Sequence, residues 1–185
     1  MACVPVRDPF RIEGPAVISF SGGRTSGYML WRILQAHGGK LPDDVKVIFA
    51  NTGKEMGETL DFVRDCSVNW NVPITWVQFT YVDGEGQHGP SFDIVDHATA
   101  NRDGTPFSEL IFSRSYLPNP VARFCTQALK IYAIKKASGF DAFTTVIGLR
   151  ADEPSRVAKL TDDRFAPLAL VGITKAHIKH FWEHN

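Results

Sequence analysis

The stretch AVISFSGGRTSGYML, residues 16–30, decides the fold. Its first five residues are mostly β-branched or aromatic, which is typical of a short buried strand. Apolar residues then recur with helical spacing from Tyr28 to Leu34, and the Gly38–Gly39 pair that follows is a common helix stop. The sequence therefore predicts a strand, a glycine turn and a helix in direct succession.

A glycine turn between a strand and a helix is suited to binding an anion. Glycine permits positive φ and a close approach of the ligand, and the first helical turn directs free N–H groups and a partial positive charge outward. The turn also carries three hydroxyls and a guanidinium, on Ser21, Thr25, Ser26 and Arg24. We therefore expect a phosphate site rather than an ordinary turn, although the spacing matches neither a Walker loop nor a GxGxxG or GxSxG motif.

The rest of the chain continues the alternation of strands and helices. Apolar runs at 45–50, 74–79 and 143–147 predict further strands, and helical spacing is found at 57–70, at 126–138 and after Thr174. Repeated units of this kind predict a doubly wound, mostly parallel α/β sheet with helices on both faces, a Rossmann-like fold. Because parallel strands end at one rim, the segments after residues 20, 50 and 147 should form one ligand crevice.

Composition predicts a single soluble domain over residues 1–185 in the cytoplasm. The chain is 44% hydrophobic, 22% charged and formally neutral, so it lacks a strong overall field for nucleic acid or membrane. The segment 81–120 is rich in Gly, Asp, Asn and Pro and carries the apolar stretch FSELIF, for which we expect a short helix. We interpret it as an insertion, either a lid that shapes specificity or a variable surface segment.

The glycine turn, SGGRTS, resembles the PP-loop SGGxxS of the adenine nucleotide α-hydrolase-like superfamily. Three later segments resemble motifs of its phosphoadenosine phosphosulfate (PAPS) reductase family, in the same order. They are Asn51–Thr52–Gly53 with Glu58–Thr59, then Arg123, Cys125 and Lys130, and finally Gly148, Arg150, Ser155 and Arg156. Together the four segments cover most of the chain, and the PAPS reductases are the nearest match.

The resemblance implies a site for ATP or PAPS and sulfur chemistry at the phosphate or sulfate end. In the reductase-like version a cysteine thiolate, assigned to Cys125, attacks sulfur with the help of a thiol donor. One alternative is an ATP pyrophosphatase that adenylates an acceptor, such as a nucleic acid, for sulfur transfer. A second alternative is a catalytically silent nucleotide-binding module. The sequence leaves open whether the chain forms a homodimer. The nucleotide-binding set is Ser21, Gly22, Gly23, Arg24, Thr25, Ser26, Asn51, Thr52, Gly53, Arg123, Lys130, Gly148, Arg150 and Arg156.

Cysteines and carboxylates set the cofactor expectations. Cys66 fits a helical core pattern, whereas Cys125 lies between cations in the sequence, so the structural and catalytic interpretations of Cys125 both stay open. An iron–sulfur cluster needs about four thiolates and hence cysteines from a C-terminal extension or a partner. The family's ECGLH-like segment is absent, which indicates a missing extension or another activity. For Mg²⁺ we expect Glu55 and Glu58 as ligands.

Overall fold

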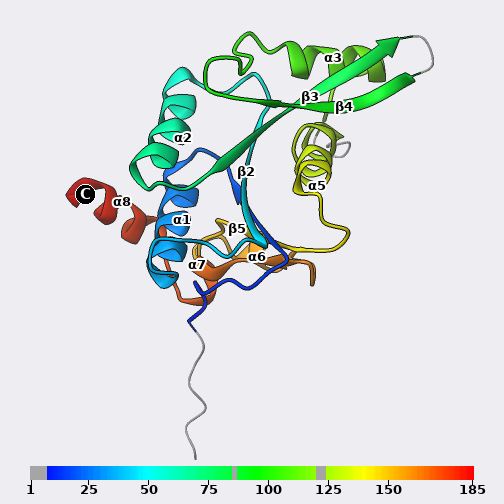
Figure 1. The fold of residues 1–185 in the computed structure, drawn as a ribbon. Helices are drawn as coiled ribbons and strands as arrows, with labels where there is room; N and C mark the ends of the chain where they lie inside the picture. Colours follow the sequence, from blue (N-terminus) through cyan, green and yellow to red (C-terminus); the bar gives the residue numbers. More distant parts are fainter. Residues whose placement is uncertain (1–7, 85–86, 120–123) are drawn as a thin grey trace, which may run out of the picture.

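The computed structural model describes residues 8–84, 87–119 and 124–185. A six-stranded sheet with the order β4-β3-β2-β1-β5-β6 forms its centre (Figure 1). Each strand pair is parallel except β3 with β4. The strands are β1 (Ala16–Phe20), β2 (Val45–Asn51), β3 (Ile74–Gly84), β4 (Gln87–Val95), β5 (Thr144–Ile147) and β6 (Arg164–Phe165).

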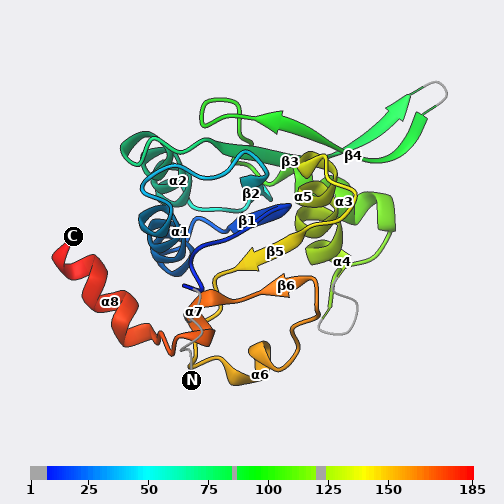
Figure 2. The same ribbon diagram turned by 60° about the horizontal axis from the view of Figure 1, so that its bottom comes forward.

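Helices cover both faces of this sheet. Figure 2 shows α1 and α2 on one side, and α4 and α5 on the other. Between α4 and α5 the helix is a π-helix, η1, so the three elements run on without a break. The helices are α1 (Arg24–Ala36), α2 (Gly57–Asn69), α3 (Thr105–Arg114), α4 (Phe124–Thr126), η1 (Gln127–Tyr132), α5 (Ala133–Ser138), α6 (Pro154–Val157), α7 (Pro167–Leu170) and α8 (Lys175–His184).

Strand β1 shows why the apolar runs of the sequence are nearly continuous. Ile18 and Phe20 belong to the core cluster that α1 and α2 cover. Val17, on the opposite side of the strand, packs in a second cluster with Ala133 and Ile134 of α5. Because successive side chains of a strand point to opposite faces, a sheet covered on both faces needs apolar residues at consecutive positions. The predicted doubly wound α/β fold is confirmed.

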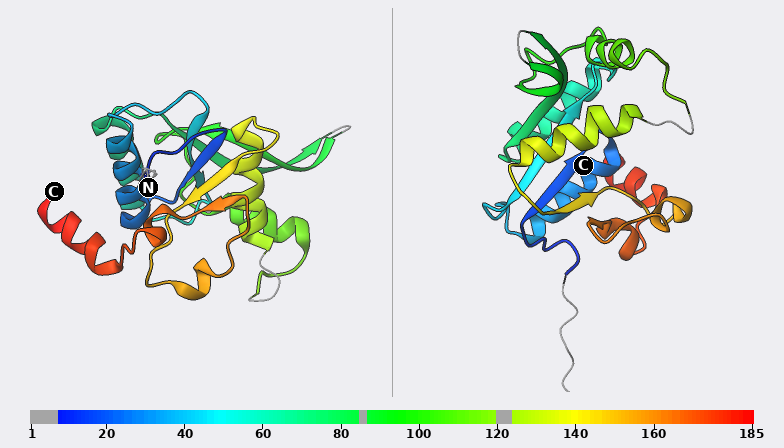
Figure 3. Two further views of the ribbon diagram at one scale, coloured as in Figure 1. Left: turned by 90° about the horizontal axis from the view of Figure 1, so that it is seen from below. Right: turned by 90° about the vertical axis from the view of Figure 1, so that its right-hand side faces the viewer.

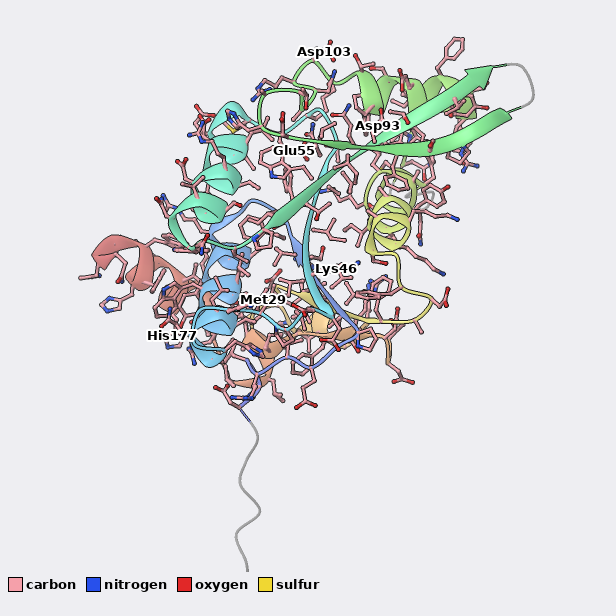
Figure 4. All side chains as sticks on the ribbon, viewed as in Figure 1. Met29, Lys46, Glu55, Asp93, Asp103 and His177 are labelled. Carbon is pink, nitrogen blue, oxygen red and sulfur yellow. The ribbon has the colours of Figure 1, made fainter. Side chains whose placement is uncertain are left out.

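The strand order reverses beside β1. The chain proceeds from β1 to β2 and β3 in one direction and then returns to β5 on the other side of β1. Such a reversal separates the two following loops and leaves a ligand crevice at the carboxyl ends of the strands. Two residues labelled in Figure 4 mark the two ends of β2: Lys46 lies near its start and Glu55 just beyond its carboxyl end.

The segment 81–120 contains more regular structure than the sequence predicts. Strand β3 extends to Gly84 and pairs antiparallel with β4, and the hairpin projects beyond the rest of the sheet (Figure 1). Gly89 and Pro90 lie in β4, where the sequence suggests a loop, because an edge strand tolerates both residue types. The expected helix around FSELIF is present as α3. A lid function for this segment remains a prediction.

The helix expected at 126–138 also differs in detail. It includes the two preceding residues, from Phe124, and its segment Gln127–Tyr132 has π rather than α geometry. Cys125 therefore lies within the first turn rather than before it. None of the helices in the described parts of the chain is both long and apolar enough to span a bilayer.

Candidate functional site

The loop that follows β1 is shaped from within by Ser26. The Ser26 hydroxyl donates to the Gly23 carbonyl at 2.9 Å and accepts from the Ser21 backbone N–H at 3.3 Å. It also lies 3.0 Å from the Ser21 hydroxyl. Ser26 is buried, whereas Ser21 is exposed. Of the three predicted hydroxyls, that of Ser26 therefore fixes the loop, and that of Ser21 lies on an exposed residue.

The two glycines of this loop have different reasons to be glycine. Gly22 has a φ of +71°, and a Cβ there would lie 2.6 Å from Thr59 Cγ2 on α2. Gly23 has an extended backbone, with φ at −97°, and the nearest atom to a Cβ there would be the Ser21 hydroxyl at 3.8 Å. Gly22 is therefore required by the fold, while Gly23 leaves an open surface that a ligand can approach.

The first turn of α1 is available to an anion. Gly23 is the N-cap and no side chain caps the helix, and the first turn holds no acidic residue. The first N–H groups of a helix lack intrahelical partners, so the turn carries unpaired donors and a partial positive charge. Arg24 and Thr25 extend from the same turn, with Arg24 exposed.

Helix α8 holds this turn in place. The indole N–H of Trp182 donates to the Arg24 carbonyl at 2.9 Å, and its ring packs on Phe62 of α2. Figure 3 shows α8 beside α1. Helical spacing identifies Trp182 only as an apolar residue, so it does not predict that Trp182 would hold the first turn of α1. Its indole N–H, which needs an acceptor when partly buried, is the signal that could have indicated it.

The loop after β5 packs against the same turn. A Cβ at Gly148 would lie 3.4 Å from the Cα and N of Ser26, so glycine allows the two loops to approach closely. Arg150 then reaches across, and its Nη1 lies 3.4 Å from the Thr25 hydroxyl. Two motifs separated by more than a hundred residues in the sequence thus meet at the crevice.

Two carboxylates bracket Arg150. It forms ion pairs with Asp152 at 2.8 Å and Glu153 at 3.3 Å. A hydrogen bond from the Lys175 backbone N–H holds the pKa of Asp152 below its ordinary value. Burial raises the pKa of Glu153, but hydrogen bonds from the Arg150 backbone N–H and from Arg156 outweigh it, and the pKa is lowered. Arg156, 67% exposed, lies farther out, so Arg150 is the better placed of the two predicted arginines.

The loop after β2 is internally bonded. Asn51 is fully buried; its Nδ2 donates to Gln78 Oε1 and to the Asn101 carbonyl, both at 2.9 Å. Its Oδ1 accepts from the Gly53 N–H at 3.1 Å. The Asn51 side chain therefore connects β2, β3 and the segment before α3, and this scaffolding role differs from the nucleotide contact that the motif predicts. The sequence contains no local pattern that identifies Gln78 and Asn101 as its partners.

Glu55 is also committed to this loop, which bears on the metal prediction. Its two carboxylate oxygens accept from the Thr52 N–H at 2.9 Å and the Thr52 hydroxyl at 2.8 Å. Glu58 lies in the first turn of α2 and is exposed. Within the described ranges no three His, Cys, Asp or Glu side chains are grouped to hold a metal ion. Glu55 is thus engaged within its own loop while Glu58 is exposed, and a Mg²⁺ held by the two stays a prediction.

A pocket of 310 Å³ joins the second and third motifs. Thr52 and Lys54 approach from the loop after β2, and Cys125 and Lys130 from α4 and η1. Phe107, Thr126 and Leu129 complete the lining. Arg123, the remaining predicted residue of the motif that contains Cys125 and Lys130, lies outside the described residues. Cys66 does not line this pocket, and burial raises the pKa of its thiol to about 12, which disfavours the nucleophilic thiolate form.

Comparison with known proteins adds a relative but no activity. No protein-family model matches the chain. The chain is 36% identical over 175 residues to a protein of Escherichia phage lambda described as "Uncharacterized nin region protein ORF290". The match covers 91% of this chain and 59% of the phage protein, so the chain spans about three fifths of this relative's length. That description states no function.

Proposed function

We propose that this chain binds an adenine nucleotide at the crevice between β1 and β5 and performs sulfur chemistry at its phosphate or sulfate end. The observation that carries the proposal is the position of the glycine loop at the topological switch point, followed by an uncapped helix with no acid in its first turn. Arg24, Thr25 and Arg150 supply further donors around the same space.

In the reductase-like version the ligand is PAPS. The loop from Ser21 to Ser26 holds the phosphosulfate, and the Cys125 thiolate attacks its sulfur. The bond between sulfur and the phosphate oxygen breaks, and the oxygen leaves with the electron pair. A second thiol, from a thiol donor, then forms a disulfide with Cys125 and releases sulfite. The lysines of the 310 Å³ pocket, Lys54 and Lys130, would stabilise both the thiolate and the departing anion.

A second candidate function follows from the cysteines. Of the two described cysteines, only Cys125 is in the pocket, so PAPS reduction requires a thiol from elsewhere. An ATP pyrophosphatase needs no cysteine for its first step. There an acceptor oxygen attacks the α-phosphorus of ATP, pyrophosphate leaves, and the adenylated acceptor is ready for sulfur transfer.

Parallel calorimetric titration with PAPS, ATP and AMP, with and without Mg²⁺, tests the proposal. Metal-independent binding of PAPS with release of sulfite supports the reductase-like version, and metal-dependent ATP binding with release of pyrophosphate supports the second. Binding without either product indicates a silent module. Gly23→Val should abolish binding while the protein stays folded, because Gly23 borders open space. Wild-type affinity in that variant would refute the nucleotide site.

A further inference from the structure

A groove of 800 Å³ lies outside the candidate nucleotide site. The β3–β4 hairpin forms one side of it, and α3 and the α4–η1–α5 helix form the others. In Figure 2 these helices lie together on the face opposite α1 and α2. Its described lining includes Tyr81 of β3, Arg114 of α3, and Phe124, Tyr132 and Lys135 of the long helix.

The spacing of these residues shows that each element presents one continuous face. Phe79 and Tyr81 are two apart on β3, and Leu110 and Arg114 are four apart on α3. Along the long helix the lining positions recur every three or four residues from Phe124 to Lys135. Asp93 of β4, labelled in Figure 4, pairs with Gln78 and so lies on the other face of the hairpin. The groove is therefore a formed surface and not a gap between loops.

Aromatic rings border the groove and continue beyond it. Tyr81 is 38% exposed, and Tyr132 fixes the hairpin by donating its hydroxyl to the Pro90 carbonyl at 3.2 Å. The Tyr116 ring, itself 48% exposed, lies 4.8 Å from the Phe124 ring. Two of these rings, Tyr81 and Tyr116, are exposed and Phe124 and Tyr132 are half-buried, and exposed rings are more typical of a recognition site than of a folded core.

Cations accompany the rings. The Arg114 guanidinium is 6.0 Å from the centre of the Phe124 ring, and the Lys136 ammonium is 5.9 Å from that of Tyr132. Lys135 adds a third positive charge. None of the described lining residues is acidic, although the chain has 20 acidic and 20 basic residues. The groove is thus locally positive on a neutral protein.

We propose that this groove binds single-stranded nucleic acid. Cations for the phosphates, interleaved with ring faces on which unpaired bases stack, are the combination that such sites use. A duplex keeps its base faces stacked inside and offers only its phosphates to these side chains. An acidic protein segment would satisfy the cations, but it does not combine a negative charge and a flat base at every unit as a nucleic-acid strand does.

The groove proposal goes beyond the proposed function and stands without it. If both hold, the strand would lie beside the candidate reaction site, because Phe124 lines the groove and Cys125 lines the 310 Å³ pocket. That arrangement would make the strand the acceptor of the second candidate function. The π geometry of η1, which separates the two hollows, is itself frequent at functional sites.

Fluorescence anisotropy with a labelled oligothymidylate of about 15 nucleotides tests the proposal. We expect binding that weakens as salt rises from about 50 to 200 mM, and weaker binding of a duplex of equal length. Lys135→Glu should weaken single-strand binding about tenfold. Lys40→Glu makes the same charge change at an exposed position after the C-terminal end of α1, outside the groove, and should have little effect. Tyr132→Ala should lose about tenfold and Tyr132→Phe almost nothing, because the phenyl ring still stacks.

Three results would overturn the proposal: no single-strand binding at the lowest salt, equal affinity for the duplex, or equal losses in Lys135→Glu and Lys40→Glu. Thermal unfolding of each variant comes first, and Lys135→Glu alters only an exposed side chain, so it remains informative if Tyr132→Ala is unstable. Gly23→Val separates the two proposals. It should abolish ATP or PAPS binding and leave oligonucleotide affinity unchanged.

Discussion

The loops after β1 and β2 have similar composition, but the structure uses them in opposite ways. Both are short, rich in glycine and hydroxyl or amide side chains, and both lie at the carboxyl edge of the sheet. In the loop after β2, the side chains of Asn51, Thr52 and Glu55 bond to neighbouring protein groups. In the loop after β1, only Ser26 does so to this extent, and Gly23 and Arg24 face solvent. A polar loop at this edge can offer hydrogen-bond donors to a ligand only where those donors are left free.

The adjacent glycines of the first loop give the largest expected effect. Gly22→Ala should lower the free energy of unfolding by about 2–5 kcal/mol, because a Cβ would meet Thr59 in a left-handed backbone. Gly23→Ala should change it by no more than about 0.5 kcal/mol. Urea denaturation of the two variants measures the difference. Equal losses would mean that Gly23 is as constrained as Gly22 and that the loop is less open than the structure indicates.

Removing the amide from the second loop should act mainly on stability. Asn51→Ala removes the three hydrogen bonds that this fully buried side chain makes with Gln78, Asn101 and Gly53, which should cost about 2–4 kcal/mol of unfolding free energy. Asn69→Ala, at the exposed end of α2, is the matched control. Calorimetry on the folded fraction should find nucleotide affinity almost unchanged. A larger loss of affinity than of stability would assign Asn51 to the ligand and erase the contrast between the loops.

Arg150 and Arg156 test the first loop from the opposite side of the crevice. Arg150→Ala should weaken nucleotide binding by about 1.5–3 kcal/mol, the range for a charge-assisted hydrogen bond. Arg156→Ala should weaken it less, since that side chain is 67% exposed and paired with Glu153. Titration with PAPS and ATP measures both. The reverse order would place the anion outside the crevice.

The smallest effect concerns the carboxylate that holds Arg150. The lowered pKa of Glu153 means that its stabilising contribution is fully present above the ordinary value of about 4.3 and is lost as the pH falls through the lowered one. Glu153→Gln should therefore cost about 1 kcal/mol at pH 7 and almost nothing near pH 2. Urea unfolding at both pH values measures this, with Glu183→Gln on exposed α8 as the control. A cost that does not depend on pH would show that the charge of Glu153 contributes nothing.

Much of the fold and part of the site could be predicted because the signals are local. The bounds of β1 were predicted to the residue, and those of β2 and α2 to within one, since buried strands and amphipathic helices have distinct periods. The strand ends placed three motifs at one rim correctly. The antiparallel strand β4 was missed, because a half-exposed edge strand with Gly and Pro has the composition of a loop.

The sequence by itself determined the doubly wound fold and the glycine turn at the end of β1. Both follow from local signals, namely the period of the apolar residues and the position of the glycines between a strand and a helix. Only the tertiary structure decided which polar groups remain free. Asn51 meets Gln78 and Asn101, Arg150 meets Thr25, and Trp182 meets Arg24 across gaps of 27 to 158 residues. Such pairings depend on how the chain crosses the sheet, and no local pattern encodes them. The same holds for the groove, whose rings and cations come from elements that the sequence keeps apart.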